Sequence, residues 1–301
     1  MKKILLIIFI VSSLVSNAQQ DAQASMYFFN PLNYNPAYAG TRGSLNLTAV
    51  HRSQWVGWEG APRTQFLSIH APIVRKRIGL GANVSYDNIG SRSNVSAMGN
   101  FAYHLQLNSK SLRLSFGASA GINSNQYDFN GLIVNDNTDI HYLTSNKSVS
   151  PNFGAGIYLH SNKGYLGFSL PRLIEKSIDN NTSKSFLQRH YYLTSGYVFN
   201  VNSVTDIKPS ILIKYTQNAP ITVDFNYSML FYNKLWIGLM YRANESVGFN
   251  SSFLVKEAFT LGYSFDYPIN NLRLNNFGSH EILFSFDLRS KNRAFISPRY
   301  F

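Results

Sequence analysis

The sequence contains no cysteine among its 301 residues. Disulfide frameworks and thiolate metal sites are therefore excluded. No run after the first 14 residues approaches the roughly 20 apolar residues that a membrane helix requires. The seven histidines form neither an H-x-H nor an H-x-x-x-H pair. With cysteine also absent, we expect a non-enzymatic protein that needs no metal and no other cofactor.

The first residues have the composition of a secretory signal peptide. Lys2 and Lys3 precede an apolar run from Ile4 to Leu14, and small and polar residues follow as far as Ala18. This pattern predicts a signal peptide over residues 1–18. The rest of the chain has no low-complexity linker, so we expect one large domain after it.

Basic residues outnumber acidic ones, and the formal net charge is +12. Such a balance suits nucleic acid, anionic lipid headgroups or an acidic protein partner. Because the predicted export signal keeps the chain away from nucleic acid, no nucleic-acid partner is expected. The lysines and arginines are scattered along the chain, so a solvated basic surface is the simplest interpretation.

Apolar and polar residues alternate through most of the chain. In "ITVDFNYSMLF", residues 221–231, Val223 and Phe225 alternate with Thr222 and Asp224. Because side chains of a strand point alternately to its two faces, each such segment is expected to be a strand with one apolar face. The pattern predicts about fourteen strands, at residues 44–53, 63–70, 77–86, 93–104, 111–121, 152–160, 164–169, 190–199, 206–215, 221–231, 234–242, 247–255, 259–267 and 280–288.

The connections between these strands alternate in length. Those after even-numbered strands are mostly short, whereas most of those after odd-numbered strands are long, including "DNIGSRS" (87–93) and residues 123–150. A soluble sandwich shares the strand pattern but has no reason to sort its loops by length. We therefore predict an all-β transmembrane antiparallel up-and-down barrel at residues 44–289, with short periplasmic turns, long external loops and a periplasmic tail at 290–301.

This fold divides the side chains between lipid and lumen. Aromatic residues at outward positions, several near strand ends, are typical of the girdles of such barrels; they are Tyr191, Tyr197, Tyr215, Phe231, Tyr241, Tyr263 and Tyr267. Charged residues of both signs are expected to face the lumen, namely Arg113, Lys208, Lys214, Asp224, Arg242, Asp266 and Asp287. A neutralised lumen, a pore and a binding cavity all fit these charges.

The segment before the first strand reads "FNPLNYNPAYAG" from residue 29 to residue 40. Proline lacks a backbone donor and disfavours helix in the residue before it, so this segment is rich in turns. We expect residues 19–43 to lie on the periplasmic side. Their rings (Phe28, Phe29, Tyr34 and Tyr38) are suited either to plugging the barrel mouth or to docking a partner.

The first external loop, "HRSQWVGWEGAP", holds two of the three tryptophans. Trp55 and Trp58 lie beside Arg52 and Gln54. Tryptophans in loops are commonly buried, either against their own protein or in an interface. These four residues are therefore candidates for an inward lid or for a partner-binding anchor.

Several ordered motifs resemble the PorP/SprF family of outer-membrane proteins, which is associated with type IX secretion and gliding motility. They run over nearly the whole mature chain and include "YFFNPLNYNPAYAG", "HRSQWVGWEGAPRTQ", "RHYYLTSGYVF", "SHEILFSFDL" and the closing "SPRYF". The resemblance implies a location in the outer membrane of a Gram-negative bacterium, in contact with outer-membrane lipid. No catalytic residues come with the family.

The resemblance also implies partners. Members of the family support the secretion or surface retention of a partner adhesin or another protein with a type IX C-terminal sorting domain. Periplasmic secretion or motility components are further implied partners. A general or solute-selective outer-membrane channel is the alternative function, because the predicted lumen carries charges of both signs.

Overall fold

The computed structural model describes residues 22–73, 77–107, 112–128, 146–174, 176–177, 186–217, 219–256 and 258–288. The predicted signal peptide (1–18) and C-terminal tail (290–301) lie outside these residues. Within the described ranges, no helix is both long and apolar enough to span a membrane. The helical segments are short 3-10 turns, of which η1 (Tyr27–Phe29), η2 (Pro31–Asn33) and η3 (Pro36–Tyr38) precede the first strand.

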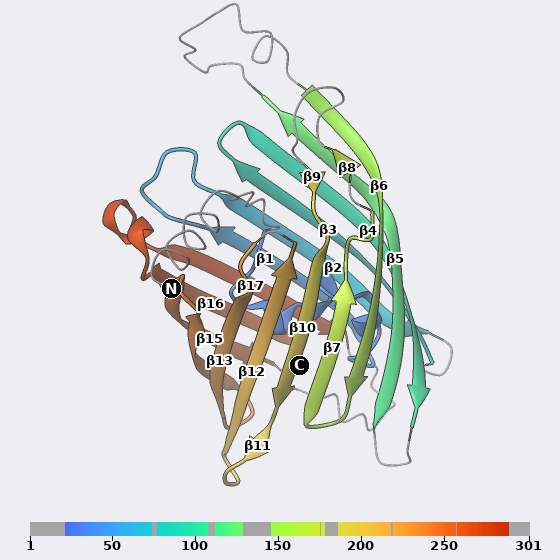
Figure 1. The fold of residues 1–301 in the computed structure, drawn as a ribbon. Helices are drawn as coiled ribbons and strands as arrows, with labels where there is room; N and C mark the ends of the chain where they lie inside the picture. Colours follow the sequence, from blue (N-terminus) through green and yellow to red (C-terminus); the bar gives the residue numbers. More distant parts are fainter. Residues whose placement is uncertain are drawn as a thin grey trace, which may run out of the picture.

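Fourteen antiparallel strands form a closed barrel, which confirms the predicted fold (Figure 1). The first strand pairs with the last, and β10 pairs with both β7 and β12, so the sheet has no open edge between them. The strands are β1 (Leu45–Ser53), β2 (Arg63–Ile73), β3 (Ile78–Ile89), β4 (Arg92–Gln106), β5 (Arg113–Tyr127), β6 (Asn146–His160), β7 (Gly164–Leu170), β10 (His190–Tyr197), β12 (Thr205–Thr216), β13 (Thr222–Phe231), β14 (Leu235–Arg242), β15 (Ser246–Val255), β16 (Phe259–Pro268) and β17 (Ser279–Leu288). Short β11 (Phe199–Asn200) also pairs with β12, and β8 (Lys176–Ser177) pairs with β9 (Phe186–Leu187).

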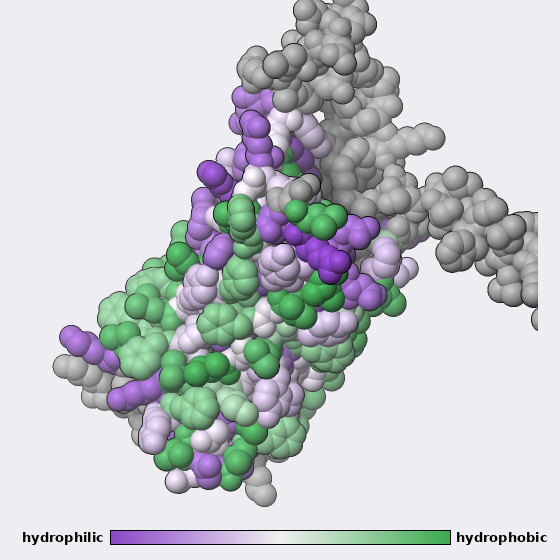
Figure 2. All heavy atoms as spheres, turned by 90° about the vertical axis from the view of Figure 1, so that its left-hand side faces the viewer, coloured by the Kyte–Doolittle hydropathy of each residue, from purple (hydrophilic) through white to green (hydrophobic). Residues whose placement is uncertain are grey.

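Burial along the strands is inverted relative to a soluble protein. In β2, Leu67 and Ile69 are 49% and 42% exposed, whereas their polar neighbours Ser68 and His70 are buried. Apolar side chains therefore face outward and polar side chains face the lumen, as lipid outside the barrel requires. Figure 2 shows hydrophobic side chains gathered over the lower part of one face, with hydrophilic ones concentrated above them.

Two of the connections that were expected to be long are shorter in the structure. "DNIGSRS" is not a long loop, because β3 and β4 continue to Ile89 and Arg92 and only two residues turn between them. The stretch 123–150 is shorter than expected as a loop, since β5 extends to Tyr127 and β6 begins at Asn146. Elsewhere the longer connections still gather at one end, where β1 leads into β2 and β16 leads into β17. By the rule for outer-membrane barrels, that end is external.

The segment 22–43 lies inside the barrel, which corrects its expected place on the periplasmic side. Gln23 bonds Asp224 and Lys214, which lie near the long-loop ends of β13 and β12. Farther along the segment, Gly40 lies against Gly79 at the short-turn end of β3. The segment therefore runs through the lumen from the external half to the periplasmic end, and we call residues 22–43 the plug.

A row of small inward-facing residues makes room for η3 of the plug. Gly79, Ala102, Gly117 and Gly156 lie directly opposite one another across β3, β4, β5 and β6. A Cβ atom on Gly117 would overlap the backbone of Ala37. The small residues thus let the plug backbone approach the wall more closely than any larger side chain would allow.

Gly117→Val is expected to displace the plug, because the added side chain occupies the position of the Ala37 backbone. Overpacking of this kind costs roughly 1–3 kcal/mol. The temperature at which the heat-modifiable barrel band is lost in electrophoresis should fall. Gly99→Val is the matched control, since the nearest atom to a Cβ there is the Ala120 oxygen at 3.7 Å. Equal effects of the two substitutions would contradict this account of the glycine row.

Candidate functional site: a filled barrel lumen

A cluster of three charged side chains lies at the seam where the last strands meet the first. Arg52 of β1 faces Glu281 of β17 directly across the sheet, and Arg52 Nη1 lies 3.3 Å from Glu281 Oε2. Its other terminal nitrogen lies 2.7 Å from Asp266 Oδ2 on β16. Arg52 and Glu281 are 1% and 0% exposed. Two carboxylates therefore flank one buried guanidinium on the inner face of the wall.

The same cluster binds the plug. The backbone N–H groups of Ser25 and Met26 donate to the two carboxylate oxygens of Glu281 at 2.7 and 2.8 Å. The Ser25 hydroxyl donates to Asp266 Oδ1 at 2.7 Å. These bonds use lone pairs that the arginine leaves free, so the wall charges are more fully satisfied with the plug in place.

A second charged cluster holds the beginning of the plug. Arg242 Nε donates to Asp224 Oδ1 at 3.0 Å, and Arg242 Nη1 lies 3.0 Å from Glu245 Oε1. The Gln23 amide donates to Asp224 Oδ2 and accepts from Lys214 Nζ, the latter at 3.0 Å. Gln23 therefore connects an acidic and a basic side chain of two neighbouring strands.

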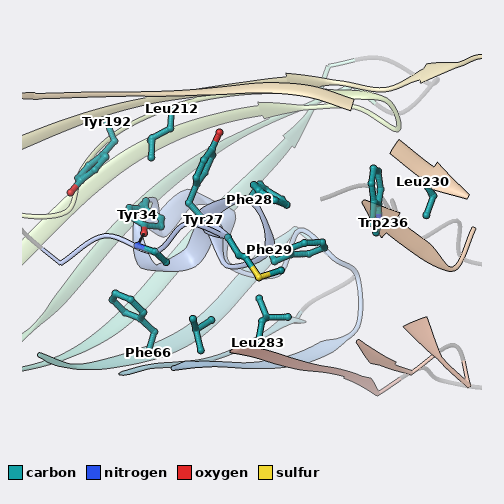
Figure 3. Close-up of a cluster of buried hydrophobic side chains, with 13 residues drawn as sticks. Tyr27, Phe28, Phe29, Tyr34, Phe66, Tyr192, Leu212, Leu230, Trp236 and Leu283 are labelled. Carbon is teal, nitrogen blue, oxygen red and sulfur yellow. Dashed lines mark hydrogen bonds between the residues drawn. The ribbon is translucent and has the colours of Figure 1, made fainter. Parts of the chain in front are cut away.

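Aromatic packing fills the middle of the lumen (Figure 3). The ammonium of Lys208 lies 4.6 Å from the centroid of Trp236 and 4.8 Å from that of Phe28. Such contacts stabilise a desolvated cation by about 2 kcal/mol. In Figure 3, side chains of the plug lie between wall residues above and below them. The buried cluster comprises Ala24, Met26, Tyr27, Phe28, Phe29, Tyr34, Val50, Phe66, Tyr192, Leu212, Leu230, Trp236 and Leu283.

Hydrogen bonds of two plug tyrosines hold the plug backbone in position. The Tyr34 hydroxyl accepts the Ala24 N–H at 2.9 Å. At the periplasmic end, Arg42 donates to the Tyr38 hydroxyl at 3.1 Å and pairs with Asp287 at 3.0 Å. The plug is thus bonded to the wall at both of its ends.

Above the plug lies a vestibule at the external mouth, with a volume of about 500 Å³. Gln54, Trp55, Arg92, Arg242 and Glu245 are among the side chains that line it. Its size is within the range of small-molecule sites. Within the described residues, no group of three His, Cys, Asp or Glu side chains is placed to hold a metal ion.

The first external loop is tied to the last one. Val56 N–H donates to the Gly278 carbonyl and Phe277 N–H donates to the Val56 carbonyl, both at 2.8 Å. Trp55 and Trp58 are half-buried, with ring centroids 5.8 Å apart. Each ring therefore keeps an exposed surface beside the vestibule.

A family model, described as type IX secretion system membrane protein PorP/SprF, matches residues 16–286. The chain belongs to the PorP/SprF family. This membership and the barrel together place the protein in the outer membrane of a Gram-negative bacterium, as a membrane barrel of the type IX secretion system. The expected family and location are thereby confirmed.

Solved structures share the fold with this PorP/SprF barrel at low identity. The CymD monoaromatic hydrocarbon channel is 12% identical with a TM-score of 0.53, covering 89% of this chain and 94% of that one. Omp33 of Acinetobacter baumannii is 9% identical with a TM-score of 0.49, covering 81% and 98%. No curated protein matches the chain. At these identities the likeness concerns the fold alone.

The predicted lumen charges of the PorP/SprF barrel can now be located. Five of them are buried inside the barrel: Lys208, Lys214, Asp224, Arg242 and Asp266. Arg113 is half-buried on the inward face of β5, and Asp287 reaches the plug through Arg42. Apart from Arg113, these charges contact the plug or one another rather than lining an open bore.

The sequence-based predictions misplaced or omitted two residues of the charged cluster at the seam, Arg52 and Glu281. Arg52 was expected in the exposed first loop beside Gln54, although the predicted strand 44–53 also contains it; the loop assignment is wrong, because Arg52 lies in β1 with its side chain buried in the lumen. Glu281 was not among the expected lumen charges. The strand alternation could have found both, since Arg52 shares a face with Thr48 and Glu281 shares one with Asp287.

Glu281→Gln should destabilise the folded barrel. The substitution removes a negative charge from the buried pair with Arg52 and turns one acceptor of the plug N–H groups into a donor. We expect a loss of about 1–3 kcal/mol in the free energy of unfolding, measured by denaturant titration in detergent.

Glu245→Gln is the matched control, because the Glu245 side chain is 38% exposed in its pair with Arg242. A pair that exposed contributes about 0–1 kcal/mol. Stability losses of the same size in the two variants would show that the seam cluster is no more important than a surface ion pair.

Proposed function

We propose that this protein is a plugged, non-enzymatic scaffold of the type IX machinery. In this role it supports the secretion or surface retention of a partner with a C-terminal sorting domain, such as an adhesin. The observation that carries the proposal is the occupation of the lumen by the chain's own residues 22–43. A barrel whose charged side chains hold an internal plug is better suited to binding a protein at its ends than to passing solutes.

The external rim supports a role in surface retention. Trp55 and Trp58 keep exposed ring surface there, and the neighbouring Leu274 and Phe277 are each 75% exposed. Aromatic and large apolar side chains of this kind dominate the energy of protein interfaces. The backbone bonds between the two loops hold this rim in one conformation, which lowers the entropy cost of binding a partner.

The opposite end supports contact with periplasmic components. The plug enters β1 there, next to the short turns, so any component that binds this end touches both the barrel and the plug. Gliding motility is the process in which such a connection between an adhesin and periplasmic motor components would be used.

Deletion of the gene should remove the partner adhesin from the cell surface, leaving it inside the cell, degraded or shed. Surface display is measured by labelling intact cells with an antibody to the partner. Complementation with the wild-type gene should restore display, whereas Trp55→Ala with Trp58→Ala should restore it only weakly if these rings bind the partner.

The stability of the doubly substituted barrel separates the two roles of the tryptophans. An anchor leaves the heat-modifiable band unchanged, while a lid lowers its transition temperature. Normal display in the deletion strain would disprove the retention function. Normal display and stability in the double variant would disprove only the role assigned to Trp55 and Trp58.

The alternative function is a solute channel, and the vestibule is the observation that favours it, because Arg92, Arg242 and Glu245 offer charges of both signs there. Planar-bilayer recording discriminates the two. The wild-type scaffold should pass no current, because its plug blocks the lumen. Glu281→Gln holds the plug less firmly and should show brief channel openings. These openings would also show that the barrel has inserted into the bilayer. Steady, ion-selective conductance of the wild-type protein would favour the channel.

A further inference from the structure

The outer wall carries a groove where β17, β1 and β2 run side by side. Its volume is about 490 Å³, and its lining is mostly apolar. Leu67, Val84, Tyr86 and Phe284 form its sides, and Ala49 lies between them. All four of these side residues are large and exposed on the membrane-facing surface.

The strand register explains why the groove forms at this place. Ala49 lies directly opposite Phe284 on one side and Leu67 on the other. A methyl group between two long side chains leaves a depression in the wall. Val50 and Phe66, which point into the lumen, also border the groove, so it reaches down to the sheet itself.

The groove becomes polar towards the external end. One row above Ala49, His51 lies opposite Gln65, and both are exposed and line the groove. Two residues farther, Ser53 lies opposite Arg63, which is also exposed. At about 3.4 Å per residue, Arg63 lies roughly 14 Å above Ala49 along the strands.

A second polar pair continues this row. Ser53 lies opposite His280 on its other side, and the Tyr263 hydroxyl is 2.7 Å from His280 Nδ1. His51 Nε2 is 3.2 Å from the Ser53 hydroxyl. Side chains that can donate or accept hydrogen bonds therefore cluster at the external edge of a surface that is otherwise apolar.

We propose that this groove binds lipid A of the outer leaflet, with one acyl chain lying over Ala49 and a phosphate at Arg63 and His51. The location identifies the occupant, because a groove in the lipid-facing wall is covered by hydrocarbon whenever the barrel is in its membrane. The polar row identifies the headgroup, because guanidinium and imidazole N–H groups bind phosphate well.

Native mass spectrometry of the full-length barrel in detergent, titrated with purified lipid A, tests the acyl part of the site. Ala49→Phe should fill the groove and weaken binding of the first lipid A molecule at least tenfold. Ala118→Phe is the matched control, since Ala118 is a small, exposed residue on the outward face of β5. Equal binding by wild type and both variants would overturn the proposal and indicate annular lipid only.

The headgroup part has its own variant. Arg63→Gln leaves the groove intact and lies at the exposed beginning of β2, so the barrel should fold normally. We expect several-fold weaker binding of lipid A and no change for phosphatidylcholine, whose headgroup carries no net charge. Preference of the wild-type barrel for phosphatidylcholine, or no effect of Arg63→Gln on lipid A, would overturn the assignment of the phosphate.

Discussion

The structure depends on the pairing of charges buried inside the barrel. Arg52, Asp266 and Glu281 lie where almost no water reaches, and an uncompensated charge there would cost several kcal/mol. Their mutual pairing meets part of this cost, and hydrogen bonds from Ser25 and Met26 meet more of it. Wall and plug therefore form one polar network, around which the aromatic side chains pack.

The alternation of apolar and polar residues along the chain was sufficient to predict the strands of the barrel wall. Because each strand has a lipid face and a lumen face, the spacing in "ITVDFNYSMLF" assigns Asp224 to the lumen without knowledge of any other strand. Loop lengths then indicated a membrane barrel rather than a sandwich. Both patterns involve residues close together in the chain, so both can be recognised from one sequence.

The remainder depends on contacts between distant residues. Whether the rings of "FNPLNYNPAYAG" pack inside or outside the barrel is decided by distant partners, such as Lys208 against the Phe29 ring and Tyr192 against the Tyr34 ring. The exact end of β3 was also missed, since pairing with the neighbouring strand extends it past the residues with clear alternation. Arg52 was misplaced although the predicted strand 44–53 contains it, because the first external loop was taken to begin at His51.

The position of the plug has a consequence for how the chain folds. Ser25 bonds Glu281 across a separation of 256 residues, and Arg52, opposite Glu281, belongs to the strand that the plug leads into. The last strand therefore completes the cylinder and the plug site in the same step. The carboxylate that accepts from Ser25 thus belongs to the strand whose pairing with β1 closes the barrel, so closure and completion of the plug site depend on the same strand.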